Sequence, residues 1–189
     1  MLERFGFPIF QDPMTRKPAD YSRDADAETC KALLKKAAAM LGRRSYSRGD
    51  LRDKLLAKEA APRVEAILDR LEQLNLLNDA EYAYNFALYR IERESWGAAK
   101  VTEALQRRHV DQETIENALR RVQSELGVET VAVEYMQKYC GKDWPPADPK
   151  QVQKLMVHLR RRGFGEDAID RALKEILSGP LYKRSEIGE

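Results

Sequence analysis

From Ala27 onward, apolar residues recur at steps of three and four along nearly the whole chain. In the first of these stretches they fall on one face of a helix, at Cys30, Leu33, Leu34, Ala37, Ala38 and Leu41. No segment alternates apolar and polar residues for long enough to indicate a strand. The pattern therefore predicts an all-α protein.

The expected helix boundaries carry residues that favour helix ends. Side chains able to cap a helix N-terminus precede four of the apolar runs, at Ser47, Asn78, Asp111 and Asp148. Pro149 suits the first turn of the helix that follows Asp148. Gly127, Gly163 and the pair Gly179–Pro180 are typical of helix C-termini.

The apolar pattern also repeats along the chain. A shift of 54 positions brings six apolar residues onto six others without a gap: Leu105, Val110, Ile115, Ala118, Leu119 and Val122 onto Leu159, Phe164, Ile169, Ala172, Leu173 and Ile176. An upstream copy fits if one residue is deleted between its second and third positions: Leu55, Ala60, Val64, Ile67, Leu68 and Leu71. Each copy follows another helical segment, so one unit contains three helices, which we expect to be long, short and medium in that order.

We therefore predict three tandem three-helix repeats that form an elongated, curved array. Their expected bounds are 27–78, 79–126 and 127–178, with an N-terminal tail over 1–26 and a C-terminal tail over 179–189. One such unit is too small to be stable alone, and stacked neighbours share apolar faces. We expect the N-terminal tail to be mobile unless a partner orders it; its Phe5, Phe7 and Phe10 suit either docking on the array or recognition by a partner.

Composition excludes several classes of protein. The chain has 189 residues, of which 43% are apolar and 34% charged, and no run of roughly 18 apolar residues that could cross a membrane. Its N-terminus lacks a signal-peptide run, and its two cysteines, without CxxC spacing, suit reduced thiols, so we predict a cytoplasmic protein. With two histidines, no phosphate loop, no dinucleotide motif and no zinc spacing, we predict no catalytic, cofactor or metal site and no enzyme.

Positive charge is concentrated although the net charge is only +2. The stretch 150–162 holds five cations and no acid, and the stretch 43–58 holds six cations against two acids. The repeat register relates Lys100, Arg107 and Arg108 to Lys154, Arg161 and Arg162. We select twelve candidate partner-binding residues from these positions: Arg43, Arg44, Arg48, Arg52, Lys100, Arg107, Arg108, Lys150, Lys154, Arg160, Arg161 and Arg162.

Two interpretations of these cations stay open. A basic row on one side of an array suits a polyanion, either nucleic-acid phosphate or an acidic protein groove. Cations in the last turn of a helix also favour the helix dipole, and surface cations improve solubility. No aromatic residue interleaves with the basic stretches, so we expect any nucleic acid to be bound through its backbone, without base stacking or sequence preference.

Two segments carry a family resemblance. The stretch from Ala39 to Leu55, AMLGRRSYSRGDLRDKL, is similar to the opening signature of the RecX regulatory proteins, and the stretch from Leu74 to Ala83, LNLLNDAEYA, resembles the junction after their first repeat. In this junction, Asn75 stands where the family usually has Gly, and Asn78 where it usually has Asp. The likeness extends over about residues 30–177, and in the last repeat it consists of the apolar pattern alone.

The resemblance implies an all-helical modulator of the RecA recombinase that is not itself an enzyme. Such a protein binds the RecA–DNA filament, limits its extension, and lowers ATP hydrolysis, strand exchange and the repressor cleavage of the SOS response, within homologous recombination and DNA repair. It implies no cofactor, membrane or small-molecule substrate. Alternatives from the residues alone are a sequence-independent binder of single- or double-stranded nucleic acid, acting through its basic helix faces, and a structural adaptor for another protein.

Overall fold

Helices account for most of the described residues. The computed structural model describes residues 18–143, 146 and 148–178, so most of the expected N-terminal tail, with its three phenylalanines, and all of the C-terminal tail, with Gly179–Pro180, lie outside the described residues. Within that part, the chain forms nine α-helices, one short 3-10 helix and no strand. The prediction of an all-α protein is confirmed.

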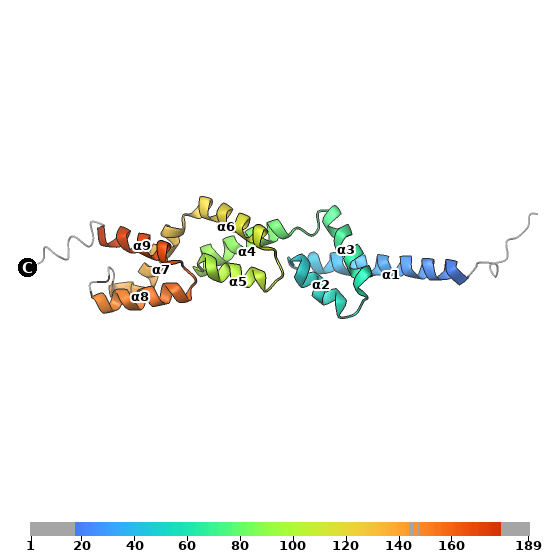
Figure 1. Cartoon of the computed structure of the whole chain (residues 1–189), viewed down its shortest axis with the longest axis horizontal. Helices are drawn as coiled ribbons and strands as arrows, with labels where there is room; N and C mark the ends of the chain where they lie inside the picture. The colour runs from blue at the N-terminus through green and yellow to red at the C-terminus, as the bar shows by residue number, and fades with distance from the viewer. Residues whose placement is uncertain (1–17, 144–145, 147, 179–189) are drawn as a thin grey trace, which may run out of the picture.

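The helices follow one another in three groups of three. Their bounds are α1 Pro18–Leu41, α2 Arg48–Leu56 and α3 Ala61–Gln73; α4 Asp79–Glu94, α5 Ala98–Gln106 and α6 Gln112–Leu126; and α7 Val128–Cys140, α8 Pro149–Arg161 and α9 Glu166–Ser178, with the 3-10 helix η2 Gly141–Asp143 after α7. We call these groups unit 1, unit 2 and unit 3. Figure 1 shows them in line, as an elongated helical array.

Two details differ from the sequence prediction. Helix α1 begins at Pro18, so residues 18–26, which we expected in the tail, are helical. The expected order of long, short and medium helices holds in units 1 and 2, where the middle helix has 9 residues. In unit 3 it does not hold, because α7, α8 and α9 each have 13 residues. Pro149 and the cap at Asp148 start α8 early enough to give it an additional turn.

All four predicted N-caps are confirmed. The side chain of Ser47 accepts a hydrogen bond from the backbone N–H of Asp50, and Asn78, Asp111 and Asp148 act in the same way at α4, α6 and α8. Asn75, which replaces the expected glycine, has a φ of 54°, in the left-handed region that asparagine tolerates better than most residues. Both departures from the family signature therefore keep the backbone role of the position.

The repeat-register residues form the core. All twelve residues related by the shift of 54 are buried, and in the upstream copy every member is buried except Ala60, which lies exposed at the start of α3. The buried residues form two separate clusters. We call the first the N-terminal core, between Leu33 and Leu77 in unit 1, and the second the C-terminal core, between Ala83 and Ile176 in units 2 and 3. Units 2 and 3 therefore share one core, while unit 1 has its own.

The two junctions between units use the same backbone position. At the first, the Ser47 hydroxyl donates to the carbonyl of Arg108 at 2.7 Å, in the turn between α5 and α6. At the second, the N–H of Gly97 donates to the carbonyl of Arg162 at 2.7 Å, in the turn between α8 and α9. Arg108 and Arg162 are equivalent in the repeat. In each junction, therefore, the start of a middle helix is held by the turn that ends the middle helix of the next unit.

The first junction is mainly polar. The N–H of Arg48 donates to Asp79 at 2.6 Å, and exposed His109 lies 3.2 Å from Asp53. Arg108 lies 3.9 Å from Asp50. No apolar cluster bridges this junction among the described residues, since the N-terminal core ends at Leu77. Its strength therefore depends on a few hydrogen bonds and on close backbone packing.

The fully buried Ser47 allows this junction to be tested. We expect Ser47→Ala to lower the free energy of unfolding by about 1–3 kcal/mol, because it removes the cap of α2 and leaves the Arg108 carbonyl without its donor. Denaturant unfolding followed by circular dichroism measures the effect. Ser124→Ala is the matched control, since the exposed Ser124 hydroxyl donates to a carbonyl of its own helix; an equal loss in both variants would contradict the assigned role of Ser47.

Candidate partner-binding surface

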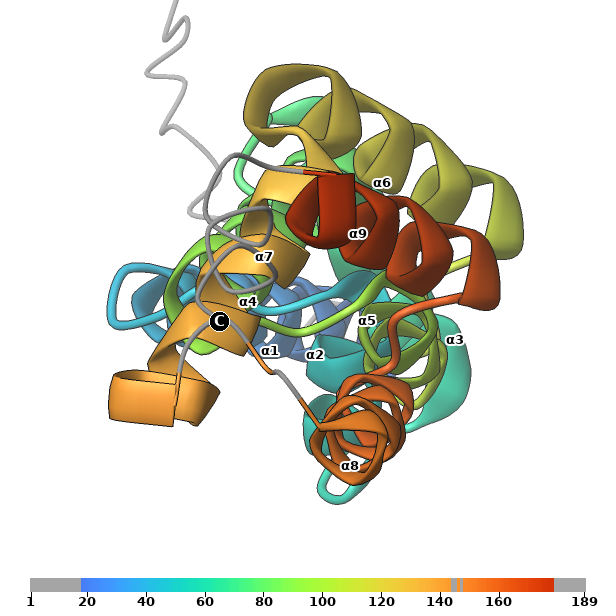
Figure 2. The same cartoon turned by 90° about the vertical axis from the view of Figure 1, so that its left-hand side faces the viewer.

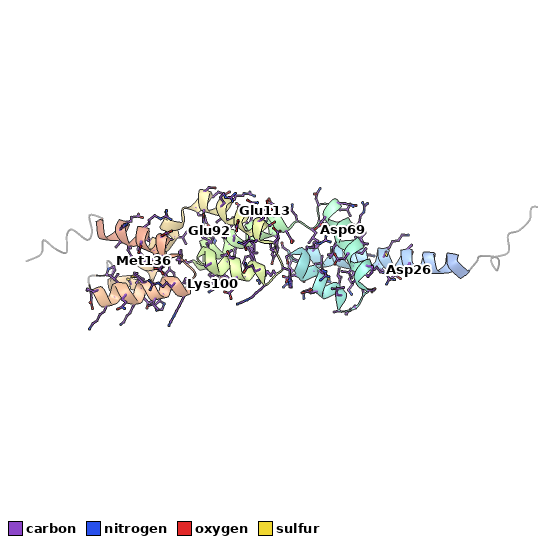
Figure 3. All side chains as sticks on the ribbon, viewed as in Figure 1. Asp26, Asp69, Glu92, Lys100, Glu113 and Met136 are labelled. Carbon is purple, nitrogen blue, oxygen red and sulfur yellow. The ribbon has the colours of Figure 1, made fainter. Side chains whose placement is uncertain are left out.

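The three middle helices lie along one side of the array. In Figure 1, α2, α5 and α8 run along its lower side, and in Figure 2, which views the array from its end, they overlap in the lower half. These helices and the turns beside them carry the twelve candidate cations. The repeat register thus brings equivalent basic positions of α5 and α8 to the same side. Lys100 of α5 is marked in Figure 3.

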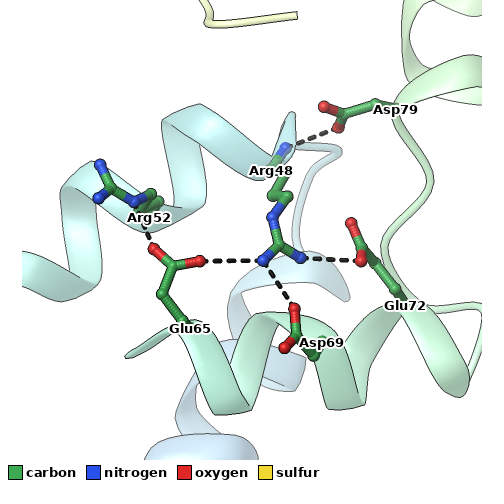
Figure 4. A network of polar contacts seen from close by, with 6 residues as sticks. All are labelled: Arg48, Arg52, Glu65, Asp69, Glu72 and Asp79. Atoms are coloured by element: carbon green, nitrogen blue, oxygen red, sulfur yellow. Dashed lines mark hydrogen bonds and ion pairs between the residues drawn. The ribbon is translucent and has the colours of Figure 1, made fainter. Parts of the chain in front are cut away.

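The side chain of Arg48 forms a network of ion pairs with carboxylates of its own unit. Its guanidinium lies 2.9 Å from Glu65, 2.7 Å from Asp69 and 2.8 Å from Glu72, all on α3 (Figure 4). Burial opposes the charge on Arg48, but hydrogen bonds to these carboxylates outweigh it and raise the pKa of the guanidinium above its ordinary value. The network links α2 to α3, so Arg48 has a structural role.

The same network includes Arg52 and Asp79. The hydrogen bond from Arg52 to Glu65, at 2.5 Å, is the main cause of a lowered pKa at Glu65. Burial raises the pKa of Asp79, although the hydrogen bond that it accepts from the Arg48 N–H partly offsets this shift. Arg52 is more exposed than Arg48, and its remaining nitrogens point away from Glu65 in Figure 4.

Arg108 and Arg162 are also engaged within the protein. Arg108 donates to the carbonyl of Ala104 at 2.5 Å and lies over the ring of Phe86 at 4.8 Å. Arg162 donates to the carbonyl of Glu94 at 3.0 Å and lies 5.0 Å from the ring centre of Tyr135. Both side chains are half-buried at the unit junctions. Sequence reasoning considered a binding role and a helix-dipole role for them, and the structure adds a third, contact between units.

Four other candidates have partners that leave them accessible. Arg107 pairs with Glu103 of the same helix, and Arg160 pairs with Glu166 at 2.6 Å. Lys100 lies 4.2 Å from the ring centre of Trp96, and Arg44 lies 4.2 Å from that of Tyr46. Exposed pairs of this kind contribute little to stability. A partner can therefore compete for these cations at low cost.

The last four candidates have exposed side chains for which no ion pair or aromatic contact is found within the described part of the chain. They are Arg43, Lys150, Lys154 and Arg161. Arg43 lies between α1 and α2, and the other three lie on α8. Of the twelve cations, these carry the charge that the protein itself neutralises least. The exposed face of α8 is therefore the most basic segment of the candidate surface.

An aromatic ring accompanies these cations, contrary to the sequence prediction. Tyr139 at the end of α7 packs against His158 of α8, with ring centres 4.3 Å apart. It lies in a groove that also contacts Lys150 and Lys154. Sequence reasoning missed it because Tyr139 precedes the basic stretch, across a connection of no fixed geometry. The statement that no aromatic interleaves with the cations is therefore wrong in space, and Tyr46, between Arg44 and Arg48, departs from it along the chain as well.

The described residues contain no group of three His, Cys, Asp or Glu side chains placed to hold a metal ion. In the same part of the chain, no helix has the length and apolar character needed to cross a bilayer.

Fold and surface together define a tandem three-helix-repeat protein whose middle helices present a basic side. Comparison with known proteins agrees with this class. Residues 78–119 match the family model described as RecX, second three-helix domain, and residues 128–173 match RecX, third three-helix domain. These ranges overlap units 2 and 3.

Relatives that match most of the chain support the same assignment. The regulatory protein RecX of Prosthecochloris aestuarii is 32% identical over 155 residues, which cover 82% of this chain and 99% of the relative. The regulatory protein RecX of Pseudomonas fluorescens is 33% identical over 150 residues, covering 77% and 92%. The chain belongs to the RecX family of regulatory proteins.

Solved structures confirm the repeat architecture. The crystal structure of RecX from Lactobacillus salivarius superposes with a TM-score of 0.72 at 21% identity, over 79% of this chain and 97% of that one. A second regulatory protein RecX gives a TM-score of 0.73 at 19% identity, over 85% and 79%. The predicted array of three-helix repeats is therefore confirmed.

Proposed function

We propose that this protein binds the RecA–DNA filament and inhibits RecA, as a cytoplasmic protein without catalytic activity of its own. It limits filament extension and thereby lowers ATP hydrolysis, strand exchange and repressor cleavage in the SOS response. The observation that carries the proposal is the RecX relationship, which extends over 99% of the relative from Prosthecochloris aestuarii. The elongated array and its basic side support it, because such a shape can contact several neighbouring subunits of a polymer.

The cations without internal partners are the proposed contact points. Arg43, Lys150, Lys154 and Arg161 lead this set, and Arg44, Arg52, Lys100, Arg107 and Arg160 can join them by exchanging a weak internal contact for a partner. Arg48, Arg108 and Arg162 make contacts within the protein that stabilise the fold, so their contribution to partner binding is indirect. A variant that tests binding must therefore leave these three arginines in place.

DNA-dependent ATP hydrolysis by RecA tests the proposal. We expect the protein to inhibit it at less than one molecule per RecA subunit, because one array that bridges subunits or blocks a filament end affects many of them. Unchanged hydrolysis at equal molar amounts would contradict the function.

A matched pair of variants tests the surface. Lys150→Ala, Lys154→Ala and Arg161→Ala together should weaken inhibition and retain helicity, because alanine is a good helix former and all three side chains are exposed. Lys31→Ala, Lys35→Ala and Lys36→Ala on α1 remove the same charge from another exposed region and should inhibit like the parent. Equal inhibition by the parent and both variants would place the contact elsewhere on the array.

A further inference from the structure

The groove between α7 and α8 differs in charge from two other grooves of the described structure. Its described lining residues are Tyr139, Lys150, Gln153, Lys154, Val157 and His158. None of them is acidic. A groove between units 2 and 3 contains Asp167 beside Arg171, and one between α1 and α4 contains Glu81. The groove at α8 therefore attracts anions, while each of the other two has a carboxylate in its lining.

An exposed aromatic ring lies in this groove and is held in place. Tyr139 is 45% exposed, and Val157 beside it is 38% exposed. The ring contacts that of His158 at 4.3 Å and stacks on that of Tyr135 at 6.3 Å, with planes 22° apart. Arg162 in turn lies 5.0 Å from Tyr135. Tyr139 is thus fixed by its neighbours and still presents nearly half of its surface to a partner.

Two lysines flank the ring. Lys150 and Lys154 are one helical turn apart on α8, which separates them by about 6 Å along its axis. Both are exposed, and neither has an ion pair among the described residues. The nearby carboxylate of Asp148 accepts the backbone N–H of Lys150 as the cap of α8. The groove therefore combines one planar apolar surface with two cations that are available for anionic groups.

We propose that this groove binds single-stranded nucleic acid, with a base stacked on Tyr139 and neighbouring phosphates paired with Lys150 and Lys154. A single strand offers flat apolar rings and regularly spaced anions together. A duplex keeps its bases inside the stack, and an acidic protein segment supplies the anions without the rings. The site does not depend on the proposed inhibition of RecA, and it can be tested in the absence of that protein.

The fluorescence anisotropy of a labelled oligothymidylate of about 20 nucleotides measures its affinity for the purified full-length protein. We expect Tyr139→Ala to weaken binding roughly 5- to 100-fold, the range of a lost base–aromatic stack. Tyr139→Trp should bind at least as well as the parent, since it keeps a flat ring. Tyr89→Ala is the matched control, because Tyr89 is 57% exposed on α4, outside this groove, and should have no effect.

Lys150 and Lys154 are tested separately, through the salt dependence of the binding affinity. Each phosphate contact to a single strand contributes about 0.7 to the slope of log affinity against log salt, so Lys150→Ala with Lys154→Ala should flatten that slope by about 1.4. Lys35→Ala with Lys36→Ala removes the same charge from α1 and should leave the slope unchanged. Equal slopes for the two double variants would show that Lys150 and Lys154 do not contact phosphates.

A strand of the same length without bases distinguishes stacking from charge alone. The parent should bind this abasic strand more weakly than oligothymidylate, and Tyr139→Ala should bind both strands equally. This comparison on the parent protein stays decisive even if the alanine variant unfolds. If the parent binds both strands equally, or if Tyr139→Ala keeps its helicity and binds oligothymidylate as the parent does, the base-stacking site is wrong and the groove is a general anion-binding surface.

Discussion

Gly97→Ala is expected to destabilise the protein by about 3 kcal/mol or more, at the upper end of what overpacking costs, and to lower its melting temperature by roughly 6–12 °C. A Cβ atom at Gly97 would overlap the carbonyl group of Gly163 and the backbone nitrogen of Phe164. These are backbone atoms, so no side-chain rotation can relieve the overlap. The two backbone hydrogen bonds of this junction, Gly97 to Arg162 and Ala99 to Gly163, would be lost as the segments separate.

The control for this prediction is Gly42→Ala. A Cβ atom there would meet only the Ala38 and Ala39 carbonyl oxygens, at 3.6 and 3.8 Å, in ordinary van der Waals contact. Thermal unfolding followed by circular dichroism compares the two variants. A melting temperature for Gly97→Ala within about 2 °C of that of the control would mean that units 2 and 3 are not in contact through this turn.

Removing unit 3 is expected to be far more damaging than removing unit 1. A chain that ends at Leu126 loses half of the C-terminal core and exposes buried residues of unit 2, so it should melt well below the full chain and with reduced helicity. A chain that begins at Asn78 keeps that core whole, because the N-terminal core ends at Leu77. It should unfold cooperatively at a temperature close to that of units 2 and 3 in the full chain. Repeat stability depends on the shared interfaces, which here are unequal.

Calorimetry of the two truncated chains and the full chain measures this asymmetry. Two transitions in the full chain, of which the chain from Asn78 keeps one, would agree with the two separate cores. Equal loss of stability from both truncations would contradict the unequal junctions. The same outcome would support a uniform array in which every neighbour contributes alike.

The unequal junctions bear on the proposed binding to a filament. Units 2 and 3 form one body through a common core, while unit 1 is attached through hydrogen bonds and polar contacts such as Asp50–Arg108 and Asp53–His109. Polar contacts of this kind exchange with water more readily than a buried apolar interface does. In the proposed complex, adjustment at this polar junction would let unit 1 follow the curvature of a helical polymer while units 2 and 3 keep a fixed shape.

The sequence by itself determined the fold class and most of the local structure. Apolar periodicity located the helices, and side chains such as Ser47 and Asp111 marked where they begin, because a cap acts within one turn of its own residue. The shift of 54 found the core, since equivalent residues in a repeat meet equivalent neighbours. The family followed from short segments around two of these boundaries.

Only the tertiary structure decided what each cation does. The twelve candidate cations include Arg48, Arg108 and Arg161 alike, yet the first is bound by three carboxylates of α3, the second lies at a unit junction beside Asp50, and the third is exposed. Tyr139 lies beside the cations of α8 only because α7 and α8 pack against each other. Periodicity shows which side of a helix is apolar, but the partners of cations such as Arg48 and Arg162 lie on other helices, and their positions exist only once the helices have packed.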